Sequence, residues 1–590
     1  MIRLADYVIN FLEEKKIETV FTVSGGGSIF LCDALYKAKK LKYISCHHEQ
    51  AAAYAAEGYA RQKNSIGCSI VTTGPGGTNA VSGVSCCWVD SIPMVFISGQ
   101  VYLDQTVSNT GIRQIGVQET NIIPIVESNT KFSVIIQNPN TIRYNLEKAF
   151  YIAQEGRPGP VWIDIPANIQ NSLIDLSKLR PFKSNKKKSY NLDQKIKSIA
   201  KLIYQSKKPL IHFGHGARIS NADKICKKFI NKHKIPFALT WNASDFIENN
   251  HPLFAGKPGA FAERGSNFIV QSSDLYISIG SRLPFMVTGY NSKDFARNAK
   301  KIMIDIDEKE LNKNNSSFID ILIQCDAKVF MTKLYNFMKV IKKENFNWNN
   351  YCRSIRNKFP IIEKSYKHQK KVNSYYFIQE LSKALDNKST IVTDMGLSFV
   401  GTHQAFKVKK NQKLFTNSGH APMGWGLPAS IGAYFSNKNR NTICLTGEGG
   451  IQMNIQELAT IKHHKIPIKI FIYNNGGYLT IKQTQQHGFN GRIMGSDKSS
   501  GISFPDYKKI SEAHEIDYIK IENNTNLDKK IKSILKNKKP LICELFMDHN
   551  QDQKPKAINK RLPNGKTIPT TFEDMYPFLE ENTIKENLYE

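Results

Sequence analysis

The sequence predicts an α/β protein built from three doubly wound parallel sheets. Short β-rich runs alternate with helix-like stretches along most of the chain, and parallel sheets are the usual product of that alternation. Several of these runs end in glycine or an acidic residue, which is typical of a strand that turns into a helix. The 590 residues suffice for about three or four domains. We expect domains at 1–180, 192–345 and 372–548, followed by a tail at 549–590.

The first domain is predicted from strand-like runs at 68–73 and 94–98 and from a helical pattern at 50–62. It ends in a buried strand closed by proline, PGPVWIDIP at 158–166. The polar, basic stretch at 180–191 has no apolar period and is typical of a linker. We therefore place the first domain boundary there.

The second and third domains repeat the alternation. In the second domain, strand-like runs precede a basic, helix-like connector; the runs lie at 208–216, 274–282 and 301–307, and the connector at 327–372. In the third domain the runs lie at 389–396, 441–450, 466–477 and 540–546. Because such sheets bind ligands at the carboxyl ends of their strands, the residues that follow these runs are the first candidates for chemistry.

The net charge of +30 is unevenly distributed. Residues 181–370 hold 35 Lys and Arg against 15 Asp and Glu, whereas residues 1–180 are nearly neutral. The sequence contains no zinc-finger spacing, aromatic-basic RNA-binding string or basic-region heptad, so we expect no nucleic-acid partner. We interpret the excess as a lysine-rich solvated surface, and attraction of anionic substrates is the alternative.

The thiols and the hydropathy indicate a cytoplasmic protein. Ten cysteines are spread along the chain without a C-x-x-C pair, which favours reduced thiols over a disulfide framework or a zinc site. No apolar run approaches the roughly 18–20 residues that a membrane span needs. Charges at Asp6, Glu13 and Glu14 interrupt the N-terminal stretch, so we expect no signal peptide and no membrane contact.

The segment 443–477 reads as a strand, a glycine turn, a helix, a second strand and then Asn-Asn-Gly-Gly. Glu448 follows the first strand and Asn475 the second, so a βαβ unit places both at one sheet edge. With the carbonyl of Gly477, they offer the hard oxygen ligands that Mg²⁺ prefers. A plain crossover is the alternative. Backbone N–H groups open to a phosphate lie at the turn glycines Gly447, Gly449 and Gly450.

This arrangement resembles the signature of thiamine diphosphate (ThDP) enzymes, a GDG turn followed about 25 residues later by Asn-Asn. The resemblance implies that Glu448, Asn475 and Gly477 hold Mg²⁺ and, through it, the cofactor's diphosphate. Glu448 departs from the family pattern, which has Asp at this position. In a near-octahedral site, the extra methylene requires a small backbone shift.

The stretch 44–61, ISCHHEQAAAYAAEGYAR, reads as a strand followed by a helix that begins near His48. The helix dipole favours Glu49 in the first turn, which alone indicates a capping role. The stretch also resembles a motif of the acetolactate synthase branch of ThDP enzymes, which implies that Glu49 contacts N1′ of the cofactor's pyrimidine. Such a carboxyl favours the imino tautomer that deprotonates C2. The resemblance further implies active sites between subunits, hence a homodimer or homotetramer.

Further stretches extend the resemblance. Residues 20–28 resemble the family's loop near the thiazolium, and residues 72–84 resemble its glycine-rich turn beside the pyrimidine. Residues 393–399 resemble a strand end that contacts the diphosphate, and residues 417–433 resemble the segment whose Met bends the cofactor. The cofactor-binding residues that these matches imply are Gly25, Gly26, Pro75, Asn79, Ser398 and Met423.

Acetolactate synthases hold FAD in the middle domain, and the resemblance implies an FAD site here. LPFM in 280–289 replaces the FDDR of the family, so an arginine and two acids are missing. A structural domain without flavin is therefore the alternative. The implied FAD contacts are Arg157, Gly214, Gly216, Arg282, Asp305 and Asp326.

The resemblance also bears on the substrate. The loop at 113–120 resembles the family's substrate loop and implies that Gln118 is a catalytic residue that assists the acceptor. Val117 and Thr484 stand where the family has large aromatic residues, which reshapes the acceptor side of the pocket. We expect the tail to fold over the active site.

The resemblance carried by these residues implies a ThDP- and Mg²⁺-dependent carboligase of the acetolactate synthase type, a transferase. A 2-keto acid, most simply pyruvate, loses CO₂ and its two-carbon unit passes to a second carbonyl. Two alternatives keep the cofactor. In one, a nucleotide-linked keto-sugar is the acceptor; in the other, the protein is a flavin-linked pyruvate oxidase.

Overall fold

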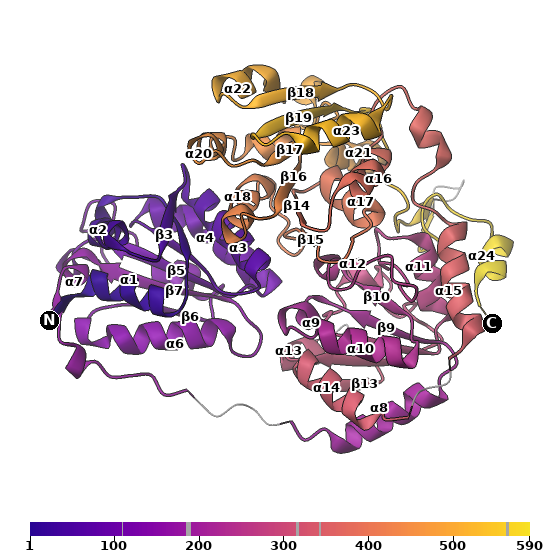
Figure 1. Cartoon of the computed structure of the whole chain (residues 1–590), viewed down its shortest axis with the longest axis horizontal. Coiled ribbons are helices and arrows are strands. Elements are labelled where there is room, and N and C mark those ends of the chain that lie inside the picture. The colour runs from indigo at the N-terminus through magenta and orange to yellow at the C-terminus, as the bar shows by residue number, and fades with distance from the viewer. Residues whose placement is uncertain (109, 185–189, 314–317, 341–343, 562–565, 590) are drawn as a thin grey trace.

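The computed structural model describes residues 1–108, 110–184, 190–313, 318–340, 344–561 and 566–589. Three domains follow one another along the chain, coloured from indigo through magenta to orange and yellow in Figure 1. Some predicted segments lie partly outside the described residues: 185–189 of the linker, 341–343 of the connector, and 562–565 and 590 of the tail.

The first domain is a parallel sheet of strand order β3-β2-β4-β5-β7-β6. Helices α1 and α6 share one apolar core, and α3 and α4 share another. Its strands are β2 (Thr19–Thr22), β3 (Lys42–Ser45), β4 (Gly67–Val71), β5 (Met94–Gln100), β6 (Phe132–Ile135) and β7 (Pro160–Pro166), with a small β1 (Ile2–Arg3) and β8 (Leu173–Ile174) pair. Its helices are α1 (Leu4–Glu14), α2 (Ile29–Lys37), α3 (Glu49–Lys63), α4 (Pro75–Asp90), α5 (Ile122–Glu127), α6 (Ile142–Gln154) and α7 (Ala167–Gln170).

The third domain repeats this topology, with strand order β15-β14-β16-β17-β19-β18 and parallel pairing. Its strands are β14 (Ser389–Thr393), β15 (Lys413–Phe415), β16 (Asn441–Gly447), β17 (Lys469–Asn474), β18 (Asp517–Ile521) and β19 (Leu541–Phe546). Its helices are α16 (Ser374–Ala384), α17 (Leu397–Ala405), α18 (Gly426–Ser436), α19 (Glu448–Gln452), α20 (Glu457–His463), α21 (Leu479–Gly488), α22 (Tyr507–Ala513) and α23 (Leu527–Lys536).

The central domain is a parallel sheet of order β10-β9-β11-β12-β13. Its strands are β9 (Pro209–Phe213), β10 (Phe237–Leu239), β11 (Leu275–Ile279), β12 (Lys300–Asp305) and β13 (Ile321–Gln324). Its helices are α8 (Asp193–Gln205), α9 (His215–Ile219), α10 (Asp223–His233), α11 (Arg264–Ser272), α12 (Phe285–Thr288), α13 (Glu308–Leu311) and α14 (Ala327–Phe337). Beyond the predicted boundary at 345, α15 (Phe346–Lys358) still packs on α11 through a shared core. The three parallel sheets confirm the predicted fold class.

Helix α3 joins the first domain to the third by packing against α18. Its alanine-rich sequence is buried along most of its length, and small side chains permit a close approach of the two backbones. A Cβ at Gly58 would lie 2.1 Å from the carbonyl oxygen of Ala429, and one at Gly432 would lie 1.7 Å from that of Ala55. One apolar core, containing residues of both domains, runs across this contact.

The tail runs from the third domain onto the central domain. At its start, Gln483 donates to the Gln551 carbonyl at 2.9 Å and Gln404 to the Pro555 carbonyl at 2.8 Å, both from the third domain. That the tail folds over the active site stays a prediction. The Phe572 ring packs on Phe295 at 5.1 Å, and the buried Glu573 pairs with Arg297 at 2.6 Å. Because these side chains find partners in the central domain, they anchor the later part of the tail there. The tail contains β20 (Lys560–Arg561), β21 (Thr567–Ile568) and α24 (Glu581–Asn587).

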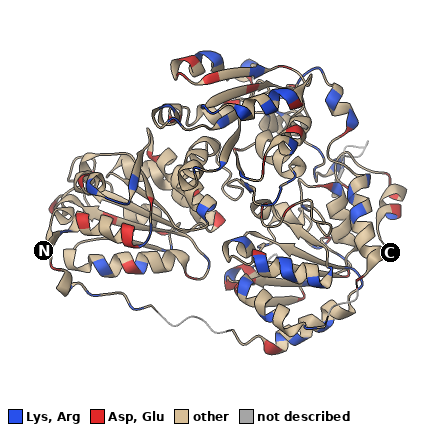
Figure 2. Ribbon diagram, in the orientation of Figure 1, with Lys and Arg blue, Asp and Glu red and all other residues tan. Residues whose placement is uncertain are grey.

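The surface and the thiols agree with the composition. Figure 2 shows blue, basic positions along the ribbon of α10, which contains Lys224, Lys227, Lys228 and Lys232. All ten cysteines fall within the described residues, and all are free. In the part of the chain that the structure describes, no helix has the length and hydrophobicity that crossing a membrane requires.

Candidate active site

The glycine turn after β16 and the turn after β17 meet at the carboxyl edge of the third sheet. Helix α19 begins at Glu448, whose Oε1 accepts the backbone N–H groups of Asn475 at 3.0 Å and Gly477 at 2.8 Å. The hydroxyl of Tyr507 donates to the Glu448 carbonyl at 2.6 Å. Burial raises the pKa of the Glu448 carboxyl to about 7. The three residues predicted to hold a metal ion therefore lie together, although they are 29 positions apart at most.

One atom of this cluster indicates a missing partner. The Oδ1 of Asn475 is buried and has no hydrogen-bond partner, a condition that costs about 1–3 kcal/mol. Among the described residues, no group of three or more His, Cys, Asp or Glu side chains could hold a metal ion. A cation at this edge would therefore rely on one carboxylate, one amide oxygen and backbone carbonyls, a donor set that fits Mg²⁺.

Of the three predicted phosphate-binding glycines, only one has open space beside it. A Cβ at Gly447 would meet nothing within 4 Å. At Gly449 it would lie 2.0 Å from the Tyr478 ring, and at Gly450 it would lie 2.6 Å from Asp394. Packing inside the protein therefore already requires Gly449 and Gly450.

Asp394, at the end of β14, is a polar centre that the sequence analysis missed. Its buried carboxylate accepts the N–H of Gly424 at 3.1 Å and the hydroxyl of Thr446 at 2.9 Å. Burial raises its pKa to about 6. Asp394 thereby fixes the residue after Met423, the predicted wedge beneath the cofactor. An acidic residue directly after the strand that ends at Thr393 is the sequence signal that indicates this position.

The Ser398 hydroxyl donates its hydrogen bond to backbone carbonyls of the turn in which it lies. The Oγ lies 3.2 Å from the carbonyl oxygen of Asp394 and 3.0 Å from that of Met395. The hydroxyl is also almost fully buried. Its predicted contact with a diphosphate stays a prediction.

In the first domain, Glu49 is the first residue of α3, as the sequence predicts. His48 caps the helix by accepting the N–H of Gln50 at 3.1 Å. The amide of Asn79 donates to Glu49 Oε2 at 2.9 Å, so two predicted site residues contact each other. Pro75 begins α4 directly after Gly74.

Two predicted glycines of the first domain lie in the loop after β2. A Cβ at Gly25 would lie 2.6 Å from the Thr72 side chain, whereas Gly26 has open space. Gly25 is therefore required by packing, and Gly26 is free to approach a ligand.

Gln118 projects from a strained turn with its side chain exposed. Its φ of 65° is left-handed, and a Cβ at Gly74 would lie 2.3 Å from its carbonyl oxygen. Behind the turn, Thr73 donates to Gln100, and Gln100 donates to the buried Asp164 at 3.1 Å. This buried chain, which the sequence analysis also missed, holds the turn that carries Gln118.

The acceptor-side positions are open to solvent. Val117 is 86% exposed, and Thr484 is exposed with its hydroxyl bonded to the Thr480 carbonyl at 2.9 Å. Neither position carries a bulky side chain that would narrow the surface around it.

A cavity of about 390 Å³ lies between the central domain and both neighbours. Of the predicted FAD contacts, five line it: Arg157, Gly216, Arg282, Asp305 and Asp326. The sixth, Gly214, packs tightly on the backbone of Ser281. The walls of the cavity also include His215 and Asn242. The buried Nε2 atom of His215 and the buried Oδ1 atom of Asn242 lack hydrogen-bond partners among the described residues.

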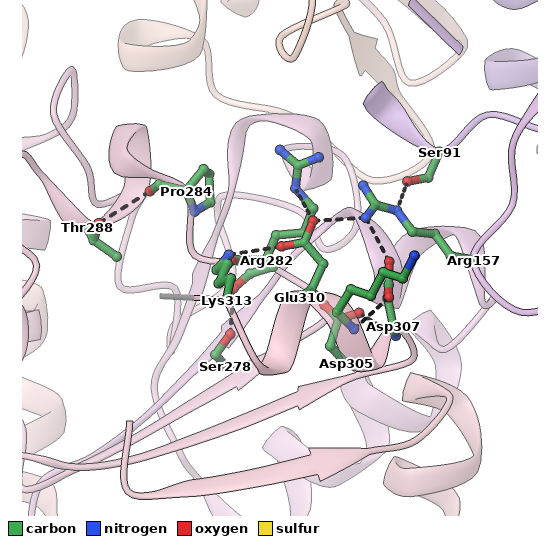
Figure 3. A network of polar contacts seen from close by, with 12 residues as sticks. Ser91, Arg157, Ser278, Arg282, Pro284, Thr288, Asp305, Asp307, Glu310 and Lys313 are labelled. Atoms are coloured by element: carbon green, nitrogen blue, oxygen red, sulfur yellow. Dashed lines mark hydrogen bonds and ion pairs between the residues drawn. The ribbon is translucent and has the colours of Figure 1, made fainter. Parts of the chain in front are cut away.

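Charges along this cavity are paired with one another. Arg157 contacts Asp307 at 3.0 Å and Glu310 at 2.9 Å, and Figure 3 shows these side chains pointing toward each other. Arg282, with φ of 58°, donates to the carbonyl of Val89 at 2.9 Å. Burial raises the pKa of Asp305. Asp326 caps α14 by accepting the N–H of Val329.

Comparison with known proteins covers all three domains. The models described as the N-terminal, central and C-terminal domains of thiamine pyrophosphate enzymes match residues 2–122, 196–334 and 394–545.

Similar proteins also match over nearly full length. The chain is 33% identical to the probable acetolactate synthase large subunit of Methanococcus aeolicus, over 96% of this chain and 94% of that protein. It is 32% identical to the acetolactate synthase large subunit of Cyanidium caldarium, over 93% and 94%. It is 27% identical to the acetolactate synthase isozyme 1 large subunit of Escherichia coli, over 93% and 95%.

Proposed function

The chain belongs to the thiamine diphosphate (thiamine pyrophosphate) enzymes, in their acetolactate synthase branch, and on that premise we propose that it is a carboligase. In this reaction pyruvate loses CO₂ and its two-carbon unit joins a second carbonyl. The observation that carries the proposal is the Glu49–Asn79 pair on one domain with the Glu448–Asn475–Gly477 cluster on another.

The residues divide the work between them. Bound ThDP supplies a nucleophilic carbon for the keto group. Glu49 would share a proton with N1′ of the pyrimidine. Asn79 orients the Glu49 carboxylate by donating a hydrogen bond to its Oε2. Asp394 fixes the backbone after Met423, on which the cofactor would bend. Gln118, exposed beside the site, is free to contact the acceptor.

We propose that Glu448, Asn475 and the Gly477 carbonyl hold Mg²⁺ for the diphosphate. The buried, unpartnered Oδ1 of Asn475 supports a cation there, because it otherwise lacks a partner. Glu448 supports the same loop through two backbone N–H groups, so its position is fixed despite the extra methylene.

Incubation with pyruvate, ThDP and Mg²⁺, followed by mass analysis of the products, tests the proposal. Acetolactate from pyruvate alone is the expected product, and no cofactor-dependent product from any 2-keto acid would contradict the carboligase. The open positions Val117 and Thr484 favour one second acceptor class, nucleotide-linked keto-sugars. Product that forms only when a keto-sugar is added would establish that alternative. Reduction of a bound flavin by pyruvate would indicate the oxidase.

We further propose that the central cavity holds FAD without redox use. The unpartnered His215 Nε2 and Asn242 Oδ1 support a polar ligand there. The internal pairing of Arg157 with Asp307 and Glu310 means that FAD must reorganise this network or bind beside it. An absorbance spectrum of freshly purified protein tests this, and the absence of a flavin band would contradict it.

The assembly and the location complete the proposal: a cytoplasmic homodimer or homotetramer. The free thiols support a reducing compartment. Light scattering at several protein concentrations tests the assembly, and a monomer throughout would contradict it.

A further inference from the structure

One short segment of the third domain contacts the turn that carries Glu49. The Asn454 amide donates to Gln50 Oε1 at 3.2 Å. The Glu457 carboxylate accepts the backbone N–H of His47 at 2.9 Å. Asn454 and Glu457 are at most 1% exposed, whereas Gln50 is half-buried and His47 is exposed. The two contacts bracket Glu49, one residue after it and two residues before it.

The same segment is continuous with the metal loop, by which we mean the turns after β16 and β17 that carry Glu448, Asn475 and Gly477. Asn454 follows the α19 helix that begins at Glu448, and Glu457 begins α20. Asn454 also donates to the carbonyl of Gly424, next to Met423, at 2.9 Å. Glu457 is held in turn by the Thr460 hydroxyl at 2.7 Å. A single crossover is therefore continuous with the turn that carries Glu448 and contacts the turns that carry Met423 and Glu49.

Glu49 depends on such support because it is the first residue of its helix. A helix end has backbone groups without helical partners and frays readily. Among the described residues of its own domain, Asn79 alone donates a hydrogen bond to the Glu49 carboxylate. The place where α3 begins thus sets where this carboxylate points.

We propose that Asn454 and Glu457 are positioning residues that hold Glu49 against the pyrimidine of the cofactor. They act through the backbone of His47 and the side chain of Gln50 and touch neither substrate nor cofactor. This inference rests on the proposed function, because it assigns Glu49 to cofactor activation. Catalytic groups must stay within about 0.5 Å of their productive place, so loosening this turn slows activation while leaving the diphosphate site intact.

A matched contact at the other end of α3 provides the control. The Thr390 hydroxyl donates to Gln62 Oε1 at 3.1 Å, again between the third and first domains, and this bond is buried. Gln62 lies 13 residues beyond Glu49, about 20 Å along the helix at 1.5 Å per residue. A general weakening of the domain contact affects both ends, whereas positioning of Glu49 involves only the first.

The test uses the ThDP- and Mg²⁺-loaded enzyme and measures hydrogen–deuterium exchange at C2 of the bound cofactor, together with the Kd for ThDP. Glu457→Leu and Gln50→Met are expected to slow exchange about 10- to 100-fold with little change in Kd. Glu457→Gln keeps an oxygen acceptor for His47 and is expected to exchange nearly at the wild-type rate. Gln62→Leu is expected to leave exchange unchanged.

The outcomes separate this inference from the proposed function. Wild-type protein that does not accelerate exchange at C2 overturns the proposed function. Accelerated exchange in the wild type that persists in folded Glu457→Leu and Gln50→Met overturns the positioning role alone. An equal loss in Gln62→Leu overturns it as well, because the contacts then only join the domains. If Glu457→Leu fails to fold, Gln50→Met decides.

Discussion

The metal loop and the central cavity balance their polar groups in opposite ways. In the metal loop, the Glu448 carboxylate accepts the backbone N–H groups of Asn475 and Gly477, and the Oδ1 of Asn475 has no partner among the described residues. In the central cavity, Arg157 is ion-paired with Asp307 and Glu310. The comparison teaches that the loop depends on an added cation for its polar balance. In the cavity, Arg157 already has carboxylate partners, and the atoms that lack partners there, His215 Nε2 and Asn242 Oδ1, belong to uncharged hydrogen-bonding groups.

The sharpest test of the cofactor side concerns Glu49. Glu49→Gln removes the carboxyl that shares a proton with N1′, so we expect carboligation to fall about 100- to 10,000-fold with the fold intact. Product formation measures the loss, and circular dichroism with thermal unfolding checks the fold. Wild-type turnover in the variant would remove Glu49 from the chemistry.

The metal loop is expected to respond next. Glu448→Ala removes a proposed ligand and the acceptor of two backbone N–H groups, so we expect the Kd for Mg²⁺ to rise about 100-fold. Titration calorimetry in the presence of ThDP measures it. Glu448→Asp, which restores the usual residue of the family, is the matched control. Equal Mg²⁺ affinity in all three proteins would show that the cation binds elsewhere.

A buried lysine of the central domain tests whether buried charges away from the cavity wall are also compensated by partners. Lys257 is 2% exposed, and burial lowers its pKa to about 8. The unfolded chain therefore binds more protons between pH 8 and about 10.5, so stability rises with pH in that window and the full cost persists below pH 8. Lys257→Met is expected to add about 2–3 kcal/mol to the free energy of unfolding at pH 7.

Urea unfolding at pH 7 and pH 10 measures this effect. The difference in the free energy of unfolding between the Lys257→Met variant and the wild type should shrink as the pH rises from 8 to 10.5. A variant that is less stable at pH 7 would mean that the ammonium has favourable contacts that outweigh its burial.

The smallest expected effect belongs to the ion pairs of the cavity. Arg157 and Glu310 are 27% and 17% exposed, so solvent screens their attraction. A double-mutant cycle with Arg157→Gln and Glu310→Gln is expected to give a coupling of about 1 kcal/mol in flavin-free protein. A coupling near zero would remove the claim that the cavity wall balances its own charges.

The sequence predicts the parts of the site that are local in the chain. The strand–turn–helix around Glu448 is confirmed by β16 ending at Gly447 and α19 beginning at Glu448. The helix predicted at 50–62 is confirmed as Glu49–Lys63. These elements follow from glycine turns and hydrophobic periodicity, which are properties of neighbouring residues.

The parts that the sequence does not predict depend on distant partners. Glu457 bonds to His47 across 410 positions, and Asp394 bonds to Gly424 across 30. Nothing beside these acids in the chain shows where their acceptor oxygens point. The contacts of the tail are not predicted for the same reason, because Phe572 and Glu573 find Phe295 and Arg297 only in the folded protein.

The contact between α3 and α18 has a consequence for building hybrids of this protein. No methyl group fits at Gly58 or Gly432, so the two backbones meet in a single register. A chimera that takes its first domain from one parent and its third from another therefore inherits half of a matched surface. Hybrids should exchange α3 and α18 together, and the recombination points belong in the linkers around the central domain.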